Sequence, residues 1–194
     1  RRLQGLRTAV VSTKDIYDEF GYGLMSREAV AAFIAYAGTA WQQPPAFVVL
    51  LGDDTYDYRN VKRGGVPCLV PTMYYHSAGR GRTPSDYLLS LVDGDDLLAD
   101  LAVGRLAASS LEEAETIVDK VIRYDLEPAP GDWRSRVLFL AGYHATGRFA
   151  ATCDSLAHHY TEPYGLQSVK IYNDSEAPVP NEQGRQFLDE LEHG

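Results

Sequence analysis

The sequence has 194 residues, of which 45% are hydrophobic and 23% charged, a balance typical of one globular domain with a buried core. The net charge is −9 and the lysines and arginines are scattered, which argues against nucleic-acid binding because that function needs a clustered basic surface. No apolar run approaches the roughly 20 residues of a membrane-spanning helix, so we expect no membrane insertion.

The first part of the sequence predicts a strand, a helix and a second strand. Arg7–Ser12 is typical of a short buried strand, and Ser26 caps a helix whose apolar residues recur at helical spacing. Phe47–Leu51 is a continuous apolar run, as expected for a parallel strand buried on both faces. Residues 55–85 look irregular, and a loop of this length is often functional or covers a sheet edge.

An acidic turn follows between two further predicted strands, Tyr87–Val92 and Leu101–Leu106. The Asp-Gly pair in the turn favours a reversal, so we expect these strands to form a hairpin. The turn gathers oxygen ligands of the kind that calcium prefers, although their spacing is not that of an EF-hand. The turn is therefore either a calcium site or a solvated acidic loop, and its acids are Asp93, Asp95 and Asp96, with Asp100 nearby.

The rest of the sequence alternates helices and strands. Ser109 with Glu112, or Ser110 with Glu113, forms a capping box. The helix that begins there is expected to bury an apolar face made of Ala114, Ile117, Val118, Val121 and Ile122. Later strands and helices are predicted at Arg136–Ala141, Phe149–Tyr160, Leu166–Tyr172 and Asn181–His193. The alternation predicts an α/β fold, a mostly parallel sheet with helices on both faces. We expect this fold to form one domain or subdomain over residues 1–194, or two βα layers that meet near residues 128–134.

Three charged residues stand out near the predicted strand ends. Asp53 and Asp54 follow Phe47–Leu51 at the place where α/β folds bind ligands. They could serve a metal-dependent receiver-like or hydrolase-like domain, or they could simply cap a loop. Arg105 ends a short strand, and if buried it needs a carboxylate partner. We expect a structural ion pair with Asp53, Asp86 or Asp100.

The histidines and cysteines show no local catalytic pattern. His144 follows the strand at Arg136–Ala141, in the right kind of place for a site. Cys68 and Cys153 permit one disulfide but do not require it, so the redox compartment stays open. The carboxylate next to Cys153 would raise the pKa of its thiol, so both cysteines are interpreted as structural.

Three consecutive segments together resemble a known family. They are FVVLLGDDTYDY at residues 47–58, SDYLLSLVDGDDLLADLAVGR at 85–105 and SSLEEAETIVDKVIRYD at 109–125. With YDEFGYG, VPCLVPTMY, WRSRVLFLAG and VKIYND in the same order, the chain is similar to the N-terminal part of the gingipain-type cysteine peptidase domain, which has a caspase-like fold.

This resemblance implies a cysteine endopeptidase in the parent protein, secreted or at the cell surface. In the family a Cys–His pair cleaves the peptide bond, and both residues follow the helix that matches Asn181–Leu191. They are therefore expected beyond Gly194, and this chain alone is expected to be inactive. Its implied partners are a polypeptide substrate and the remaining half of the peptidase domain. An apolar edge left uncovered would also permit self-association.

The resemblance also suggests roles for individual residues. His144 stands near the position of the family's orienting acid, and Asp154 is the nearest match to a carboxylate in the specificity pocket of arginine-specific members. Family members bind structural calcium, which would suit the acidic turn; no cofactor is expected for the chemistry. Because His144 replaces an acid, a degenerate caspase-like module that serves in secretion or assembly is the alternative.

Overall fold

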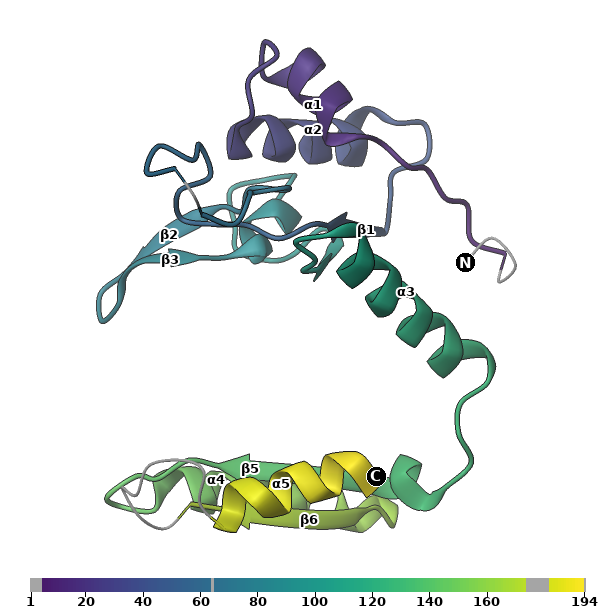
Figure 1. Cartoon of the computed structure of the whole chain (residues 1–194), viewed down its shortest axis with the longest axis vertical. Coiled ribbons are helices and arrows are strands. Elements are labelled where there is room, and N and C mark those ends of the chain that lie inside the picture. Colours follow the sequence, from purple (N-terminus) through teal and green to yellow (C-terminus); the bar gives the residue numbers. More distant parts are fainter. Residues whose placement is uncertain (1–4, 64, 174–181, 194) are drawn as a thin grey trace. The chain divides into compact units, whose positions relative to one another are not determined.

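The chain folds into two compact units, Arg1–Glu127 and Pro128–Gly194, each with its own pair of parallel strands (Figure 1). The computed structural model describes residues 5–63, 65–173 and 182–193. Helices and parallel strands alternate in both units, which confirms the predicted mixed α/β class. The described strands form three two-stranded sheets, whereas the sequence predicted one mostly parallel sheet.

The core of the first unit lies beneath two helices, α1 (Thr13–Phe20) and α2 (Arg27–Ala40). The Ser26 hydroxyl accepts the Ala29 N–H at 3.0 Å, which confirms the predicted cap. One face of α2 is almost completely buried and packs against Leu50 and Leu89. The predicted strand at Arg7–Ser12 is wrong. These residues belong to no strand, Val10 is 95% exposed, and Ser12 instead caps α1.

The central strands of this unit are β1 (Phe47–Leu51) and β4 (Ala102–Leu106), which pair in parallel. Both had been predicted from their apolar sequence. Burial on both faces was wrong, because only one face of β1 packs on the described core. Leu50 is 7% exposed, whereas Phe47, Val49 and Leu51 are between 52% and 69% exposed.

The segment between these strands differs most from the predictions. The stretch expected to be irregular contains an antiparallel hairpin, β2 (Tyr74–Ser77) with β3 (Gly81–Pro84). The predicted strand at Tyr87–Val92 is wrong, because a 3₁₀ helix, η2 (Asp86–Ser90), stands there. Leu89 and Ser90 are both 2% exposed, and successive residues of a strand would instead point to opposite faces. The predicted acidic hairpin is also wrong, since β4 pairs with β1.

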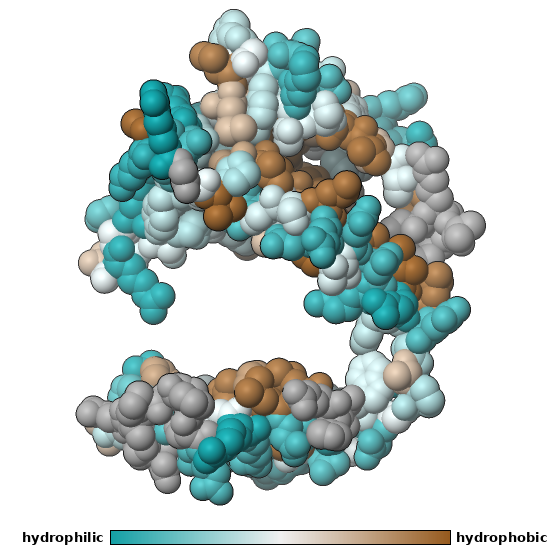
Figure 2. Space-filling view, in the orientation of Figure 1, coloured by the Kyte–Doolittle hydropathy of each residue, from teal (hydrophilic) through white to brown (hydrophobic). Residues whose placement is uncertain are grey.

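Helix α3 (Leu111–Leu126) begins as expected but does not bury its apolar face. Ser110 accepts the Glu113 N–H at 3.2 Å, and the Glu113 carboxylate accepts the Ser109 N–H at 2.7 Å. The predicted burial is wrong, because no residue of α3 is buried within the described chain. Figure 2 shows apolar side chains on the surface of the molecule. The exposed ones on α3 include Val118, Val121 and Ile122.

The second unit confirms most of its predicted elements. Strands β5 (Arg136–Ala141) and β6 (Gln167–Tyr172) pair in parallel, with α4 (Arg148–Tyr160) between them in sequence. Helix α5 (Glu182–His193) follows, and a 3.0 Å ion pair from Arg136 to Glu190 joins it to β5. The predicted start of this helix at Asn181 lies outside the described residues. No described helix is both long and apolar enough to span a bilayer.

Candidate functional site

The carboxyl ends of β1 and β4 lie together because the two strands are parallel and in register. Gly52 continues the ladder, since its N–H donates to the Leu106 carbonyl at 3.0 Å. Its φ is +139°, and a Cβ there would lie 2.8 Å from the Leu69 Cβ. The Asp53 carbonyl accepts the Leu69 N–H at 2.9 Å. Only glycine fits this turn, which fixes where the next two aspartates stand.

Asp53 and Asp54, the two acids predicted at this strand end, are occupied by protein donors. The Asp53 carboxylate accepts the Asp54 N–H at 2.9 Å. The Asp54 carboxylate accepts the Tyr74 hydroxyl at 3.0 Å and the Cys68 thiol at 3.2 Å. The described residues contain no group of three or more acids, histidines or cysteines arranged to hold a metal ion. This geometry therefore gives no support to a metal-dependent centre at these aspartates.

Cys68 has the surroundings of a structural thiol. It is 8% exposed, and both cysteines are free. Burial, together with the hydrogen bond to Asp54, raises the pKa of the Cys68 thiol to about 11. A nucleophilic cysteine needs the opposite, because the thiolate is the reactive form. Burial and the same carboxylate also raise the pKa of Tyr74 to about 12.

Arg105 is largely buried, and its guanidinium joins several segments near the ends of β1 and β4. Its Nε and Nη2 donate to the two oxygens of Asp86 at 2.7 and 2.8 Å, in a bidentate pair. Its Nη1 donates at 2.7 Å to the carbonyls of Gly52 and Val70. Asp86 also accepts the Thr72 hydroxyl. Of the three acids considered from the sequence, Asp86 contacts the guanidinium, whereas Asp53 and Asp100 bind other donors.

The Arg105–Asp86 pair is largely buried, and its hydrogen bonds favour the charged form of Asp86. The side chains of Arg105 and Asp86 are 13% and 25% exposed. Burial alone would raise the pKa of Asp86, but the hydrogen bonds from Arg105 and Thr72 outweigh it and hold that pKa below its usual value. The contacts of this guanidinium are all internal, so its role is to fasten β1, the segment around Val70 and η2.

The acidic turn is organised by Asp100. Its carboxylate accepts the N–H groups of Val92 and Asp93 at 2.8 and 3.0 Å, and these bonds lower its pKa. Asp96 accepts the Leu98 N–H at 2.8 Å. Asp93, Asp95 and Asp96 are exposed and form no ligand group of the kind described above. Calcium binding at this turn therefore stays a prediction.

His144 lies in the second unit, directly after β5. Its Nδ1 accepts the Thr146 N–H at 3.3 Å and stands 3.0 Å from the Thr146 hydroxyl. Its ring packs edge-on against Phe149, with 4.8 Å between centroids. Accepting through Nδ1 leaves Nε2 to carry the proton in the neutral ring. His144 is half-buried, and its contacts with Thr146 and Phe149 hold the ring in place after β5.

Asp154 lies on the exposed side of α4 and already binds a cation. It accepts the Lys170 ammonium and the Tyr172 hydroxyl, both at 2.9 Å. The hydrogen bond from Lys170 lowers the pKa of Asp154, and the same bond raises the pKa of Lys170. The sequence analysis did not identify Lys170, Thr72 or Tyr74 as partners, because each meets its acid only through the fold.

Comparisons with known proteins show the family to which the chain belongs. No curated protein matches the chain. The arginine-specific cysteine proteinase gingipain R (RgpB) matches with a TM-score of 0.66 and 17% identity, over 92% of this chain and 37% of its own. A complex of the pro- and mature domains of RgpB from Porphyromonas gingivalis matches with a TM-score of 0.60 and 16% identity, over 92% and 38%. These structures share the fold, and this chain spans less than two-fifths of either. The profile of peptidase family C25 matches residues 1–194, so the chain belongs to peptidase family C25.

Proposed function

We propose that this chain is part of a cysteine endopeptidase whose catalytic cysteine and histidine lie outside residues 1–194. The family match along the whole chain carries the proposal. In such an enzyme a thiolate attacks the peptide carbonyl while a histidine transfers the proton to the leaving amine. The state of Cys68 supports an external nucleophile, because its thiol is buried and bonded to a carboxylate. Cys153 has no hydrogen bond to a histidine within the described residues.

The rest of the peptidase domain is the partner that we propose for the apolar surfaces that the first unit, taken by itself, leaves uncovered. Phe47, Val49 and Leu51 line the open face of β1, and Val118 and Ile122 lie exposed on α3. Large exposed apolar patches mark interfaces. Without that partner the same surfaces would favour self-association, which light scattering would detect. By family, the parent protein acts on polypeptides outside the cell.

In the parent enzyme, we assign Asp154 to recognition of a basic side chain. The family resemblance motivates this assignment. Because Asp154 is paired with the Lys170 ammonium at 2.9 Å, a basic substrate side chain would have to displace that ammonium. His144 is assigned to the position of the family's orienting acid, as a ring held by Thr146 and Phe149 after β5. The degenerate, non-catalytic alternative rests on this same histidine, because an acid would be expected there.

The deciding experiment compares the 194-residue chain with its full-length parent in a peptidase assay. The parent should cleave a peptide with a basic residue before the scissile bond, and a thiol alkylator should abolish that activity. The chain alone should be inactive. Cleavage by the chain alone, lost in Cys68→Ser or Cys153→Ser, would refute the external nucleophile. An inactive, correctly folded parent would instead favour the degenerate module.

A further inference from the structure

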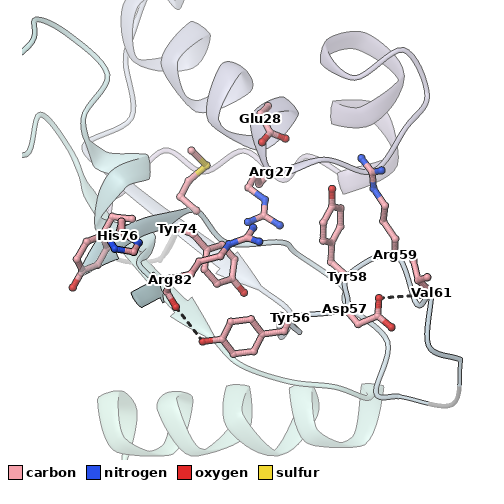
Figure 3. Close-up of a pocket in the computed structure, with 12 residues that line it drawn as sticks. Arg27, Glu28, Tyr56, Asp57, Tyr58, Arg59, Val61, Tyr74, His76 and Arg82 are labelled. Carbon is pink, nitrogen blue, oxygen red and sulfur yellow. Dashed lines mark hydrogen bonds between the residues drawn. The ribbon is translucent and has the colours of Figure 1, made fainter. Parts of the chain in front are cut away.

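The first unit contains a polar cavity of about 700 Å³ that the proposed peptidase chemistry does not use (Figure 3). Its walls come from the first turn of α2, the loop near residues 56–61 and the β2–β3 hairpin. Tyrosines and arginines dominate these walls, although the protein as a whole is acidic, with a net charge of −9. The volume falls within the range of ligand pockets, roughly 300–1,000 Å³.

Arg27 is the innermost cation of this cavity. It is 7% exposed, and its guanidinium lies 4.8 Å from the ring centre of Tyr58 and 4.6 Å from that of Tyr74. Within the described part of the chain, no carboxylate pairs with it. Buried charges are usually paired, because desolvating an unpaired ion is costly. The tyrosine faces offset part of that cost, but they leave its N–H donors available to an anion.

A second arginine converges on the same ring. The guanidinium of Arg82, from β3, lies 4.4 Å from the ring centre of Tyr74. Both groups therefore line the same cavity and contact the same ring, which Figure 3 draws together with them. Like charges placed together repel, and an anion between them would remove the repulsion. Tyr74 is itself held by its 3.0 Å hydrogen bond to Asp54, so the ring that both cations contact is fixed.

The acids of the cavity do not neutralise these arginines. The carboxylate of Asp57 accepts the N–H groups of Val61 and Lys62 at 3.0 and 2.8 Å, so it serves its own loop. Glu28 is exposed, and Figure 3 shows it directed away from the guanidinium of Arg27. Arg59 adds a third guanidinium at the margin, 5.2 Å from the ring centre of Tyr58. The cavity therefore presents cations with available donors and aromatic walls.

We propose that this cavity binds an acidic segment of a polypeptide, with an Asp or Glu carboxylate between Arg27 and Arg82. Guanidinium forks suit carboxylates, and the neighbouring tyrosine faces suit the apolar side chains beside such a residue. Tyr56 is 72% exposed and Tyr75 is 47% exposed, so aromatic surface remains open at the rim. A bare phosphate would satisfy the cations but would leave those rings unused.

Binding to the 194-residue chain tests this proposal without any peptidase activity, so it can fail independently of the proposed function. The probe is a fluorescein-labelled peptide, Gly-Phe-Glu-Glu-Phe amide, followed by anisotropy, with the Gln-Gln peptide as its uncharged counterpart. The Glu-Glu peptide should bind and the Gln-Gln peptide should bind at least tenfold more weakly, about the value of one charge-assisted hydrogen bond. No binding at millimolar peptide, or equal binding of both peptides, would overturn the proposal.

Variants place the binding in the cavity. Arg82→Met should weaken the Glu-Glu peptide about tenfold. Arg134→Met is the matched control, since Arg134 also stacks on an aromatic ring, 5.3 Å from Trp133, but lies in the second unit, and it should leave the affinity unchanged. Arg27→Met should abolish binding. Because Arg27 is buried, circular dichroism must show that this variant is folded. If the Arg27→Met variant is unfolded, the result for Arg82→Met decides. Unchanged affinity in Arg82→Met, or displacement of the peptide by equimolar inorganic phosphate, would overturn the proposal.

Discussion

The two units each contain an ion pair close to a strand end, and the pairs differ in almost every physical respect. Arg105 and Asp86 in the first unit are largely buried, bidentate and tied to two backbone carbonyls. Lys170 and Asp154 in the second unit are 32% and 55% exposed, and one nitrogen makes the contact. The first pair fastens three segments of chain, whereas the second lies at the surface, where water and salt screen it. Burial and the number of partners therefore separate a charge that fastens the fold from one that contributes little to it.

The largest effect should come from breaking the buried pair. Arg105→Met leaves the Asp86 carboxylate without its main partner and two carbonyls without a donor. We expect a loss of about 3–5 kcal/mol in the free energy of unfolding of the first unit, as for other broken buried pairs. The chain has two tryptophans, Trp41 and Trp133, one in each unit. Urea unfolding monitored by Trp41 fluorescence in a Trp133→Phe background isolates the first unit.

The control for this change is Arg105→Lys, which keeps the charge but cannot form the bidentate fork, so it should recover only part of the loss. A Trp41 transition that does not move in Arg105→Met would show that the fastening role is wrong. Trp133 fluorescence, measured in a Trp41→Phe background, should report no change in the second unit.

A smaller effect is expected from Asp86→Asn, and it should depend on pH. The folded pKa of Asp86 lies below its unfolded value, so its charge stabilises the fold above about pH 4, and the contribution is lost as the pH falls through the folded pKa. At neutral pH the variant should lose about 1–3 kcal/mol, because amide and carboxylate are similar in shape but not in charge. Between pH 4 and 2 its stability should fall less steeply than that of the parent chain. Parallel acid limbs would contradict this assignment.

The same contrast explains what the sequence could predict. Strands β1, β4, β5 and β6 follow from apolar runs, and the α2 and α3 caps follow from Ser26 and Ser110, since both signals are local. The requirement that a buried Arg105 find a carboxylate was also predictable. The identity of that carboxylate was not predictable, because Asp86 reaches Arg105 only when η2 replaces the expected strand.

The errors have a common physical origin. The mostly apolar run Tyr87–Val92 fits a strand, but Leu89 and Ser90 are both buried by the packing of η2 against the rest of the unit. The role of the cavity arginine Arg27 does not follow from the helix pattern, because apolar spacing carries no information about a charged residue at the first helical position. Its burial depends on Tyr58 and Tyr74, which both lie far along the chain from Arg27.

The smallest effect on stability should come from Lys170→Met, which removes the exposed partner of Asp154. Exposed pairs contribute little to folding because water and salt screen them, so the Trp133 unfolding midpoint should hardly move. The pKa of Asp154, followed by NMR of its carboxyl carbon, should rise, because the hydrogen bond from Lys170 is the main cause of its lowered value. Lys170→Arg is the control and should keep the pKa low. If the pKa of Asp154 stays low in Lys170→Met, another group holds that carboxylate, and its assignment to substrate recognition loses its support. A rise in pKa with unchanged stability would instead show that the fold does not need the Lys170 ammonium, as the recognition of a basic side chain by Asp154 requires.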